Sequence, residues 1–437
     1  MQTGAAVRAD FLPLDELAAV RAENWRAQTE HVSRQSAFYH HHLNGRALDP
    51  RLEALGDVPF TDKEMLRADQ AAHPPFGSYL AARADGIARL HRTSGTTGTA
   101  MNLALSRRDA ELTAIVGGRA QAAAGLGPGD RVVHCLNYQM WMGGLTDHMT
   151  LEATGATVVP FGVGSTETLI RTIRELKVTA ISCTPSYPAV LERVIAERFP
   201  DLTPRDLGLR LGLFGGEAGL DDPAFRARLE ATWGFAVRNA NYGVTEVLCN
   251  FAGQCEATTD LHFMAPDVLQ AELIEPEGAS PLPWQAGETG ELVLTHLAKD
   301  CQPLVRFRTG DLITLTHTET CACGRTAPRF RVVGRADDMV VVRGINVFPT
   351  MVAAAVNRIG GLGGEYRIVL DGPGPHDHLP VEAEAAADPP DPDAAAALVD
   401  LIKREIGVTA RVRLLEHGAL PRTAGKTRRV IRHKGET

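Results

Sequence analysis

The sequence predicts an α/β protein with a large N-terminal domain of layered α/β structure, a β-rich part within that domain, and a small α+β C-terminal domain. Apolar strands alternate with helical segments over residues 88–215, short alternating strands follow over 267–316, and a new strand restarts the pattern at 339. We place the domain boundary so that residues 1–335 form the larger domain and residues 336–437 the smaller, mobile one.

The first elements are predicted from hydrophobic spacing. Leu14, Leu17 and Trp25 recur at helical intervals, which predicts one helix over 14–43. Further helices are expected at 107–124, 143–154, 166–176 and 185–198, and strands at 131–136, 156–161, 178–183 and 209–216. Strands that alternate with helices in this way favour a parallel sheet.

The later elements have a different character. Alternating strands at 269–275 and 290–297 indicate antiparallel pairing. The C-terminal domain is expected to contain strands at 339–344, 366–371, 379–384 and 410–416, with helices from 349 and at 394–406. The segment PPDPD, 389–393, is expected to be a loop before the last helix.

Composition excludes several classes of protein. The chain has 437 residues, of which 44% are hydrophobic and 22% charged, as in ordinary globular proteins, and a net charge of −8 that does not favour nucleic-acid binding. No apolar run approaches the roughly 18 residues that span a bilayer, and Arg8 and Asp10 interrupt the N-terminal stretch, so we expect neither a membrane segment nor a signal peptide. Seven cysteines in a chain of this size indicate a reducing cytoplasm, with clustered cysteines binding metal. A homodimer is left open.

A glycine- and threonine-rich segment, TSGTTGT at 93–99, lies between a strand-like stretch and a helix. Its glycines let backbone N–H groups converge on phosphate, and its hydroxyls add donors. A flexible polar turn is the alternative. The segment is not a Walker loop, because no Gly-Lys-Ser/Thr closes it.

A second segment, PRTAGKT at 421–427, displays Lys426 on a loop after a strand. Leu420 occupies the position where a Walker loop would need glycine, and basic residues follow the segment. A solvated basic tail is therefore the alternative.

Two carboxylates stand in short motifs. Glu246 follows Thr245 in YGVTEV, 242–247, and oxygen ligands of this kind suit Mg²⁺ held against phosphate. Asp311 lies in RTGDLI, 308–313, where a carboxylate accepts hydrogen bonds from ribose hydroxyls. A solvated loop glutamate is the alternative for Glu246.

Taken together, these strings resemble the adenylate-forming enzymes, the superfamily of acyl-CoA synthetases, luciferases and peptide-synthetase adenylation domains. The matching strings, in order, are TSGTTGT, FGGE (214–217), YGVTE (242–246), RTGDL (308–312), GRADDMVVVRGINVFPT (334–350) and PRTAGKTRRV (421–430). The strings DDMVVVRGINVFPT, CACGRT and TPSYP (184–188) are most similar to the phenylacetate–CoA ligase branch.

The resemblance implies two half-reactions. The carboxylate of an acid attacks the α-phosphate of ATP and gives acyl-AMP, and a thiol, CoA in most members, then displaces AMP. The first step needs charge neutralisation more than proton transfer. An acceptor other than CoA, such as an amine or a carrier-protein thiol, is the runner-up. A non-enzymatic zinc-bearing module is a third reading, against which Glu246, Asp311 and Lys426 argue together.

The resemblance also implies a role for each matching residue. Lys426 is the adenylation lysine, Thr245 contacts the α-phosphate, Glu246 binds Mg²⁺, Asp311 holds the ribose, Arg335 contacts ribose or phosphate, and Asp337 is the hinge. The phosphate cradle comprises Thr93, Ser94, Gly95, Thr96, Thr97 and Gly98. The residues placed at the adenine are Gly216, Glu217 and Tyr242, and Gly243 is a further nucleotide-binding residue. Ala100 and Met101 stand where many members have Pro-Lys.

The acid is expected beside NYQMWMGGL, 137–145. Bulky side chains there favour a planar aromatic acid with a polar ring substituent. The predicted substrate residues are Tyr138, Trp141, Gly143, Gly144 and His148, with Met140 and Met142 as further walls, Gln139 as a further hydrogen-bonding group and His134 nearby. The alternatives are that Trp141 and its methionine neighbours face the core and that the histidines are structural.

A zinc site is also predicted. Cys321 and Cys323 form C-x-C, and Cys255 and His262 precede them. Three thiolates and one imidazole are a structural zinc set, and branch members with the same pattern support it. The alternative is that Cys255 and His262 are ordinary buried residues. Cys249 and Cys301 are candidates to replace one of the four ligands. ATP, Mg²⁺, CoA and structural Zn²⁺ are thus the expected ligands.

Overall fold

The computed structural model describes residues 6–93, 100–217, 219–372, 376–420 and 429–433. By its internal contacts the chain divides into two compact units. The first comprises residues 1–216 and 230–331, and the second comprises 217–229 and 332–437.

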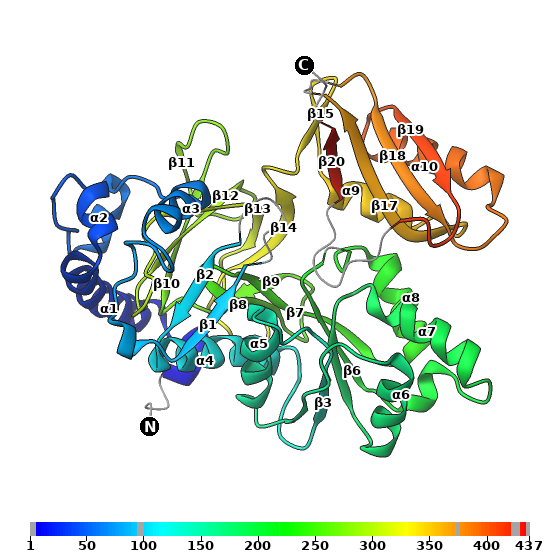
Figure 1. Ribbon diagram of the computed structural model, residues 1–437, viewed down its shortest axis with the longest axis horizontal. Coiled ribbons are helices and arrows are strands. Elements are labelled where there is room, and N and C mark those ends of the chain that lie inside the picture. Colours follow the sequence, from blue (N-terminus) through cyan, green and yellow to red (C-terminus); the bar gives the residue numbers. More distant parts are fainter. Residues whose placement is uncertain (1–5, 94–99, 218, 373–375, 421–428, 434–437) are drawn as a thin grey trace. The chain divides into compact units, whose positions relative to one another are not determined.

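The parallel half of the first unit follows the predicted alternation of strands and helices (Figure 1). Its strands are β3 (Arg131–His134), β4 (Thr157–Val159), β5 (Ala180–Cys183) and β6 (Leu211–Gly215). Its helices are α4 (Arg107–Ala123), α5 (Met142–Glu152), α6 (Thr166–Glu175) and α7 (Tyr187–Arg198), with a short 3-10 helix η4 (Pro204–Leu207). Every residue of β5 and β6 is buried, as expected for parallel strands covered on both faces.

The antiparallel half begins earlier than the sequence predicted. It comprises β7 (Ala236–Val244), β8 (Leu248–Gln254), β9 (Leu261–Phe263), β10 (Leu269–Ile274), β11 (Pro281–Leu282), β12 (Thr289–His296), β13 (Phe307–His317) and β14 (Arg329–Arg335), and α8 (Pro223–Trp233) precedes it. Within the described residues both halves form one twelve-stranded sheet in the order β11-β10-β12-β13-β14-β9-β8-β7-β6-β5-β3-β4. Strand β7 is the junction, because it pairs in parallel with β6 and antiparallel with β8.

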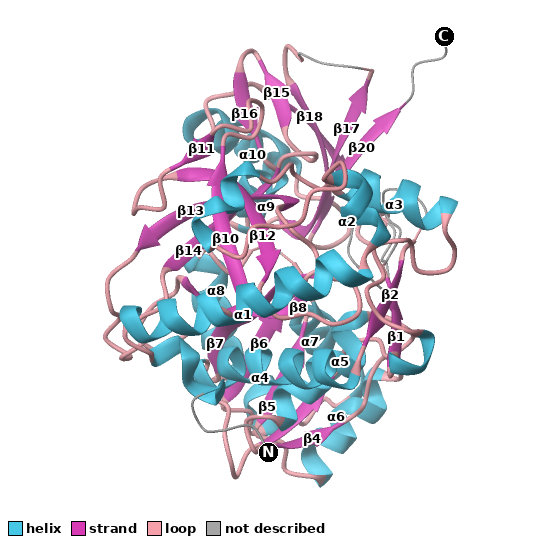
Figure 2. Ribbon diagram, turned by 90° about the vertical axis from the view of Figure 1, so that its left-hand side faces the viewer, coloured by secondary structure: helices cyan, strands magenta, loops and turns pink. Residues whose placement is uncertain are grey.

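The predicted single helix over 14–43 is wrong. The structure has α1 (Leu14–Gln35) and α2 (Ala37–His42), separated by Ser36 in an extended conformation with φ −99° and ψ 106°. The Ser36 hydroxyl accepts a hydrogen bond from the Tyr39 backbone N–H and so starts the second helix. Helix α1 lies beside β10: the Arg21 guanidinium donates to the Gln270 side chain of β10, and the Asn24 side chain donates at 2.9 Å to the Asp267 carbonyl just before the strand (Figure 2).

The rest of the N-terminal region contains one short α-helix and a β-hairpin. Helix α3 (Lys63–Ala72) precedes β1 (Arg89–Arg92) and β2 (Asn102–Leu105), which pair antiparallel. Three 3-10 helices complete it: η1 (Ala6–Phe11), η2 (Leu52–Asp57) and η3 (Ala84–Gly86).

The second unit has its own core. It contains β15 (Val340–Val342), β16 (Ile345–Val347), α9 (Pro349–Asn357), β17 (Leu362–Asp371), β18 (Leu379–Ala385), α10 (Pro392–Glu405), β19 (Ala410–Leu415) and β20 (Val430–His433). Its main sheet has the order β19-β18-β17-β20, and buried side chains of α9 and α10 pack with it in one hydrophobic cluster. The predicted α+β character of this region is confirmed.

In the parts of the chain that the structure describes, no helix combines the length and the apolar character that a bilayer crossing requires.

Candidate active site

The hairpin that joins β7 to β8 holds the motif YGVTE in a tightly closed turn. The Val247 backbone N–H donates to the Val244 carbonyl at 2.9 Å. A Cβ atom on Gly243 would lie 1.9 Å from the Cys249 carbonyl oxygen, so only glycine fits there. Thr245 and Glu246 therefore stand at the tip of a rigid hairpin. Sequence reasoning read this segment as a loop and missed the two strands.

Two residues predicted to bind the nucleotide meet across the sheet. The Tyr242 hydroxyl on β7 donates to Asp311 Oδ2 on β13 at 2.7 Å. The Tyr242 ring packs edge-on against Phe251 and Phe330, with centroids 5.2 and 5.6 Å apart. These contacts fix the orientation of a buried carboxylate that the sequence placed at the ribose.

The predicted magnesium ligand Glu246 is buried and ion-paired. Its Oε1 atom lies 2.7 Å from the ammonium nitrogen of Lys63, the first residue of α3. Sequence reasoning did not single out Lys63. The only local signal was Asp62, whose side chain caps α3, and that signal says nothing about a partner on a distant hairpin.

The base of the glycine- and threonine-rich segment is fixed by Thr93. Its hydroxyl oxygen accepts from the Met101 backbone N–H at 2.9 Å, and its own N–H donates to the Met101 carbonyl at 2.9 Å. Ser94, Gly95, Thr96, Thr97 and Gly98 lie outside the described residues, as does Lys426.

The remaining predicted nucleotide residues occupy separate places. Gly216 follows β6 with φ +82°, a conformation that glycine adopts without strain. Glu217 comes next in the chain and belongs to the second unit. Also in the second unit, the Arg335 guanidinium donates to both carboxylate oxygens of Asp337, at 2.8 and 3.2 Å.

The predicted acid-binding segment leads into α5. The indole of Trp141 lies against Gly143, since a Cβ atom on that glycine would be 2.9 Å from the ring. A Cβ on Gly144 would lie 2.3 Å from the Asn137 carbonyl oxygen. The Tyr138 hydroxyl and His148 Nδ1 are 2.9 Å apart, and His148 Nε2 is 3.1 Å from Glu152 Oε1. The structure thus brings Tyr138 and His148 together.

Met142 of this segment and the nearby His134 have structural roles. Met142 is 2% exposed and packs with Leu103 and Leu105, as the core alternative predicts. His134 is fully buried, and its Nε2 atom lies 3.1 Å from the carbonyl oxygens of Gly143 and Gly144. Burial lowers the pKa of His134 to about 4, so the ring is neutral near pH 7 and holds the start of α5.

The four predicted metal ligands converge. The ligand atoms of Cys255, His262, Cys321 and Cys323 all lie within 4.8 Å of one another. The Cys255 and Cys321 sulfurs are 4.0 Å apart, and the Cys323 sulfur is 3.7 Å from His262 Nε2. Tetrahedral zinc with Zn–S bonds of about 2.3 Å separates its ligand atoms by roughly 3.8 Å. The donors therefore fit one zinc ion.

The electrostatics of this cluster are uneven. Burial lowers the pKa of His262 to about 4, which keeps the imidazole in its neutral, metal-binding form. Burial raises the pKa of Cys255 to about 11. Burial also opposes ionisation of Cys323, but hydrogen bonds from Arg325 outweigh it, so the pKa of that thiol is lowered. Arg325 in turn donates to Asp10 at 2.6 Å, which ties the cluster to the N-terminal segment.

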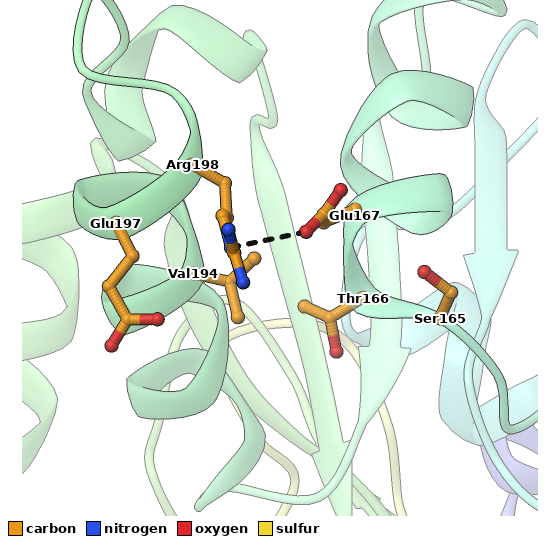
Figure 3. Close-up of a pocket in the computed structure, with 6 residues that line it drawn as sticks. All are labelled: Ser165, Thr166, Glu167, Val194, Glu197 and Arg198. Atoms are coloured by element: carbon orange, nitrogen blue, oxygen red, sulfur yellow. Dashed lines mark ion pairs between the residues drawn. The ribbon is translucent and has the colours of Figure 1, made fainter.

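A surface pocket of about 240 Å³ lies elsewhere, between α6 and α7 (Figure 3). Arg198 Nε and Glu167 Oε1 face each other across it at 3.4 Å. Of the predicted site residues that the structure describes, none lines this pocket.

Comparison with known families decides the identity. The family described as AMP-binding enzyme matches residues 18–297, and the AMP-binding enzyme C-terminal domain matches residues 344–434. The chain belongs to the AMP-binding enzyme family. The predicted adenylate-forming fold is confirmed, and the chain is an ATP-dependent ligase that activates an acid and transfers the acyl group to CoA.

Several members of this family resemble the chain over nearly its full length. Phenylacetate–coenzyme A ligase of Thermus thermophilus is 33% identical over 448 residues, covering 97% of this chain and 98% of that enzyme. The enzymes of the same name from Aromatoleum evansii and Escherichia coli are 34% and 30% identical and cover 95% and 96% of the chain, or 94% and 95% of their own lengths.

Solved structures of another family member agree with the fold. 2-Hydroxyisobutyryl-CoA ligase in its postadenylation state, with 2-HIB-AMP bound, superposes with a TM-score of 0.88 at 29% identity over 98% of this chain and 92% of that one. The same enzyme with 2-HIB-AMP and CoA in its thioesterification state gives a TM-score of 0.71 at 29% identity, covering 99% and 94% of the two chains.

Proposed function

We propose that this ligase activates an aromatic carboxylic acid that is planar and carries a polar ring substituent. The observation that carries the proposal is the segment that leads into α5, where the Trp141 indole lies against Gly143 and the Tyr138 hydroxyl lies 2.9 Å from His148 Nδ1. An indole offers a flat, polarisable wall, and the pair offers hydrogen-bonding groups to a ring hydroxyl or amine. The similarity to phenylacetate–coenzyme A ligases supports the same substrate class.

A second candidate class is the small branched hydroxy acids. It is favoured by the similarity to 2-hydroxyisobutyryl-CoA ligase, at a TM-score of 0.88. The Tyr138–His148 pair would then contact the hydroxyl of the acid rather than a ring substituent.

ATP–pyrophosphate exchange across a panel of acids tests the proposal. The panel contains benzoates, phenylacetates, cinnamates, amino- and hydroxybenzoates, 2-hydroxyisobutyrate and medium-chain fatty acids, assayed with wild type and Trp141→Ala. We expect an aryl acid to give the highest kcat/KM and Trp141→Ala to lower it. If 2-hydroxyisobutyrate or a fatty acid is activated better, the aryl assignment is wrong. If unsubstituted rings match the amino and hydroxy acids, only the polar-substituent part fails.

The residues take their roles in two balanced steps. A carboxylate oxygen of the acid bonds to the α-phosphorus of ATP while pyrophosphate leaves. The sulfur of CoA then bonds to the acyl carbon while AMP leaves and the thiol proton passes to solvent. Magnesium, when bound, neutralises phosphate charge.

In the first step we assign Glu246 to magnesium, Thr245 to the α-phosphate and Lys426 to the charge that develops on the phosphates. Asp311 accepts from the ribose hydroxyls, and its hydrogen bond from Tyr242 supports this orientation. The assigned phosphate cradle is Thr93 to Gly98, the adenine residues are Gly216, Glu217 and Tyr242, and Gly243 is a further nucleotide-binding residue. We expect Arg335 at the ribose or phosphate, and Asp337 as the hinge between residues 1–335 and 336–437.

We also assign one structural zinc ion to Cys255, His262, Cys321 and Cys323. The convergence of three thiols and one neutral imidazole within 4.8 Å supports this assignment. All four ligands come from protein, so the ion stabilises the fold and has no position for substrate. Elemental analysis should give about one zinc per chain.

A further inference from the structure

Lys63, the first residue of α3, forms an ion pair with Glu246, which is far from it in the sequence. The Lys63 ammonium nitrogen is 2.7 Å from Glu246 Oε1. The Glu246 side chain is only 6% exposed, whereas that of Lys63 is 36% exposed. A carboxylate this buried requires a partner, since an unpaired charge in such a place is strongly unfavourable. Lys63, by contrast, keeps part of its side chain in contact with solvent.

The backbone that carries Lys63 is fixed from both sides. Thr61 forms a bridge to Phe307 on β13: its N–H donates to the Arg306 carbonyl at 3.0 Å, and its carbonyl accepts from the Arg308 N–H at 2.8 Å. Asp62 then caps α3 by accepting from the Met65 N–H at 2.8 Å. The residues just before Lys63 are thus anchored to β13, which is the strand that also carries Asp311.

The same helix is tied to the end of the phosphate-binding segment. The Gln70 amide of α3 accepts from the Asn102 N–H at 3.0 Å and donates to the Asn102 carbonyl at 2.7 Å. Asn102 begins β2, directly after the segment 93–101. Helix α3 therefore bridges the hairpin of Glu246 and the base of the segment expected to cradle phosphates.

That segment itself brings no positive charge. Residues 93–101 read TSGTTGTAM and include neither lysine nor arginine. A triphosphate carries several negative charges, so cationic groups must come from other elements. Only six of the 45 lysine and arginine residues in this chain are lysines. A basic residue at position 63 would therefore be arginine if composition alone decided it. An ammonium is a compact point charge that can move between two anions.

We propose that Lys63 is a further residue of the adenylation site, one that holds the Glu246 carboxylate until Mg²⁺ and ATP arrive and then pairs with the triphosphate. The inference rests on the proposed assignment of Glu246 to magnesium. Lys63 and Mg²⁺ compete for one carboxylate, and the ammonium released by the metal is left beside the phosphates. Lys63 would act in the first half-reaction only, because the second develops no new charge on a triphosphate.

The test compares Lys63→Met with Lys63→Arg and with Lys403→Met, which removes an exposed lysine from α10 of the second unit. For Lys63→Met we expect ATP–pyrophosphate exchange to fall about 100-fold, as for the loss of one charge-stabilising donor. Thioester formation from supplied acyl-AMP and CoA should stay within about threefold of wild type, because this half-reaction develops no charge on a triphosphate that Lys63 could stabilise. Lys403→Met should match wild type in both assays.

A second arm needs no turnover. Mg²⁺ alone, added to nucleotide-free protein, should raise the melting temperature of Lys63→Met more than that of wild type, because the competing ammonium is gone. Adding Glu246→Gln to Lys63→Met should abolish this response. If Lys63→Met is too unstable to assay, Lys63→Arg keeps the charge and should hold the wild-type melting temperature while exchange still falls.

Three results would overturn the proposal: exchange by Lys63→Met within twofold of wild type, equal losses in both half-reactions, or an unchanged response to Mg²⁺. If wild type exchanges with no acid at all, the proposed substrate assignment fails, whereas the Mg²⁺ arm still decides the role of Lys63.

Discussion

The Tyr242 hydroxyl donates a hydrogen bond to the Asp311 carboxylate at 2.7 Å, which joins the strand at the parallel–antiparallel junction to β13. Tyr242 is also the residue that starts the YGVTE turn. The ribose assignment and the magnesium assignment therefore depend on one rigid unit. A substitution at Tyr242 should therefore weaken the binding of ATP more than the binding of the acid.

Tyr242→Phe removes the hydroxyl but keeps the ring against Phe251 and Phe330. We expect KM for ATP to rise about tenfold, near the lower limit for the loss of one hydrogen bond to a charged group, with KM for the acid unchanged. Steady-state kinetics with each substrate varied separately measure this. Equal increases in both KM values would contradict the assignment of Tyr242 and Asp311 to the nucleotide.

Gly243→Ala tests how tightly the hairpin of Thr245 and Glu246 is closed. The added Cβ would lie 1.9 Å from the Cys249 carbonyl oxygen, so the two strands must separate. We expect a lower melting temperature and loss of most exchange activity. The matched control is Gly127→Ala, where an added Cβ meets no atom within 4 Å. Similar behaviour of the two variants would show that the hairpin tolerates a looser closure.

Asp147 predicts a pH dependence of stability. This buried residue of α5 accepts hydrogen bonds from Cys249, at 2.8 Å, and from Asn241. Burial raises its pKa from 3.8 to about 7, although both hydrogen bonds oppose the shift. The folded protein therefore retains a proton that the unfolded chain has lost between these pH values, so Asp147 stabilises the fold below pH 3.8 and this contribution is lost as pH rises to about 7.

Asp147→Asn removes that titration and can still accept from Asn241. Relative to wild type, the variant should gain stability between pH 4 and pH 7, by at most about 1.4 kcal/mol per pH unit, and no more above pH 7. Urea unfolding at several pH values measures the difference. A difference independent of pH would mean that the pKa of Asp147 is the same in the folded and the unfolded chain.

Cys323→Ser tests the zinc assignment. Loss of one thiolate should lower zinc content and melting temperature together, and activity should fall only as far as folding does. Cys301→Ser is the control, because this buried cysteine lies outside the cluster. Full stability of metal-free protein, or loss of zinc in the control, would refute the assigned ligand set.

Local patterns predicted much of the fold and of the site. The strands at 178–183 and 209–216 could be predicted, because a parallel strand that is buried on both faces consists of a run of apolar residues. The break at Ser36 could not, because hydrophobic spacing continues through it and only the capping hydroxyl marks the new helix. The convergence of Cys255, His262, Cys321 and Cys323 was expected from thiol and imidazole chemistry together with the resemblance to branch members that share the pattern.

Residues whose roles depend on distant partners could not be predicted in the same way. Lys63 is an ordinary residue at a helix start until the fold brings it to Glu246. Asp147 and Cys249 likewise became partners only through the packing of α5 on β8. The residues next to them in the sequence do not indicate that these contacts form.

The central claim is that the chain adenylates an aryl acid with ATP and transfers the acyl group to CoA. The most direct measurement is a product assay, by chromatography and mass spectrometry, with the best aryl acid from the panel, ATP, Mg²⁺ and CoA. The account predicts aryl-CoA and AMP in equal amounts, with aryl-AMP accumulating when CoA is omitted. Formation of ADP and phosphate, or aryl-AMP that persists when CoA is present, would contradict it.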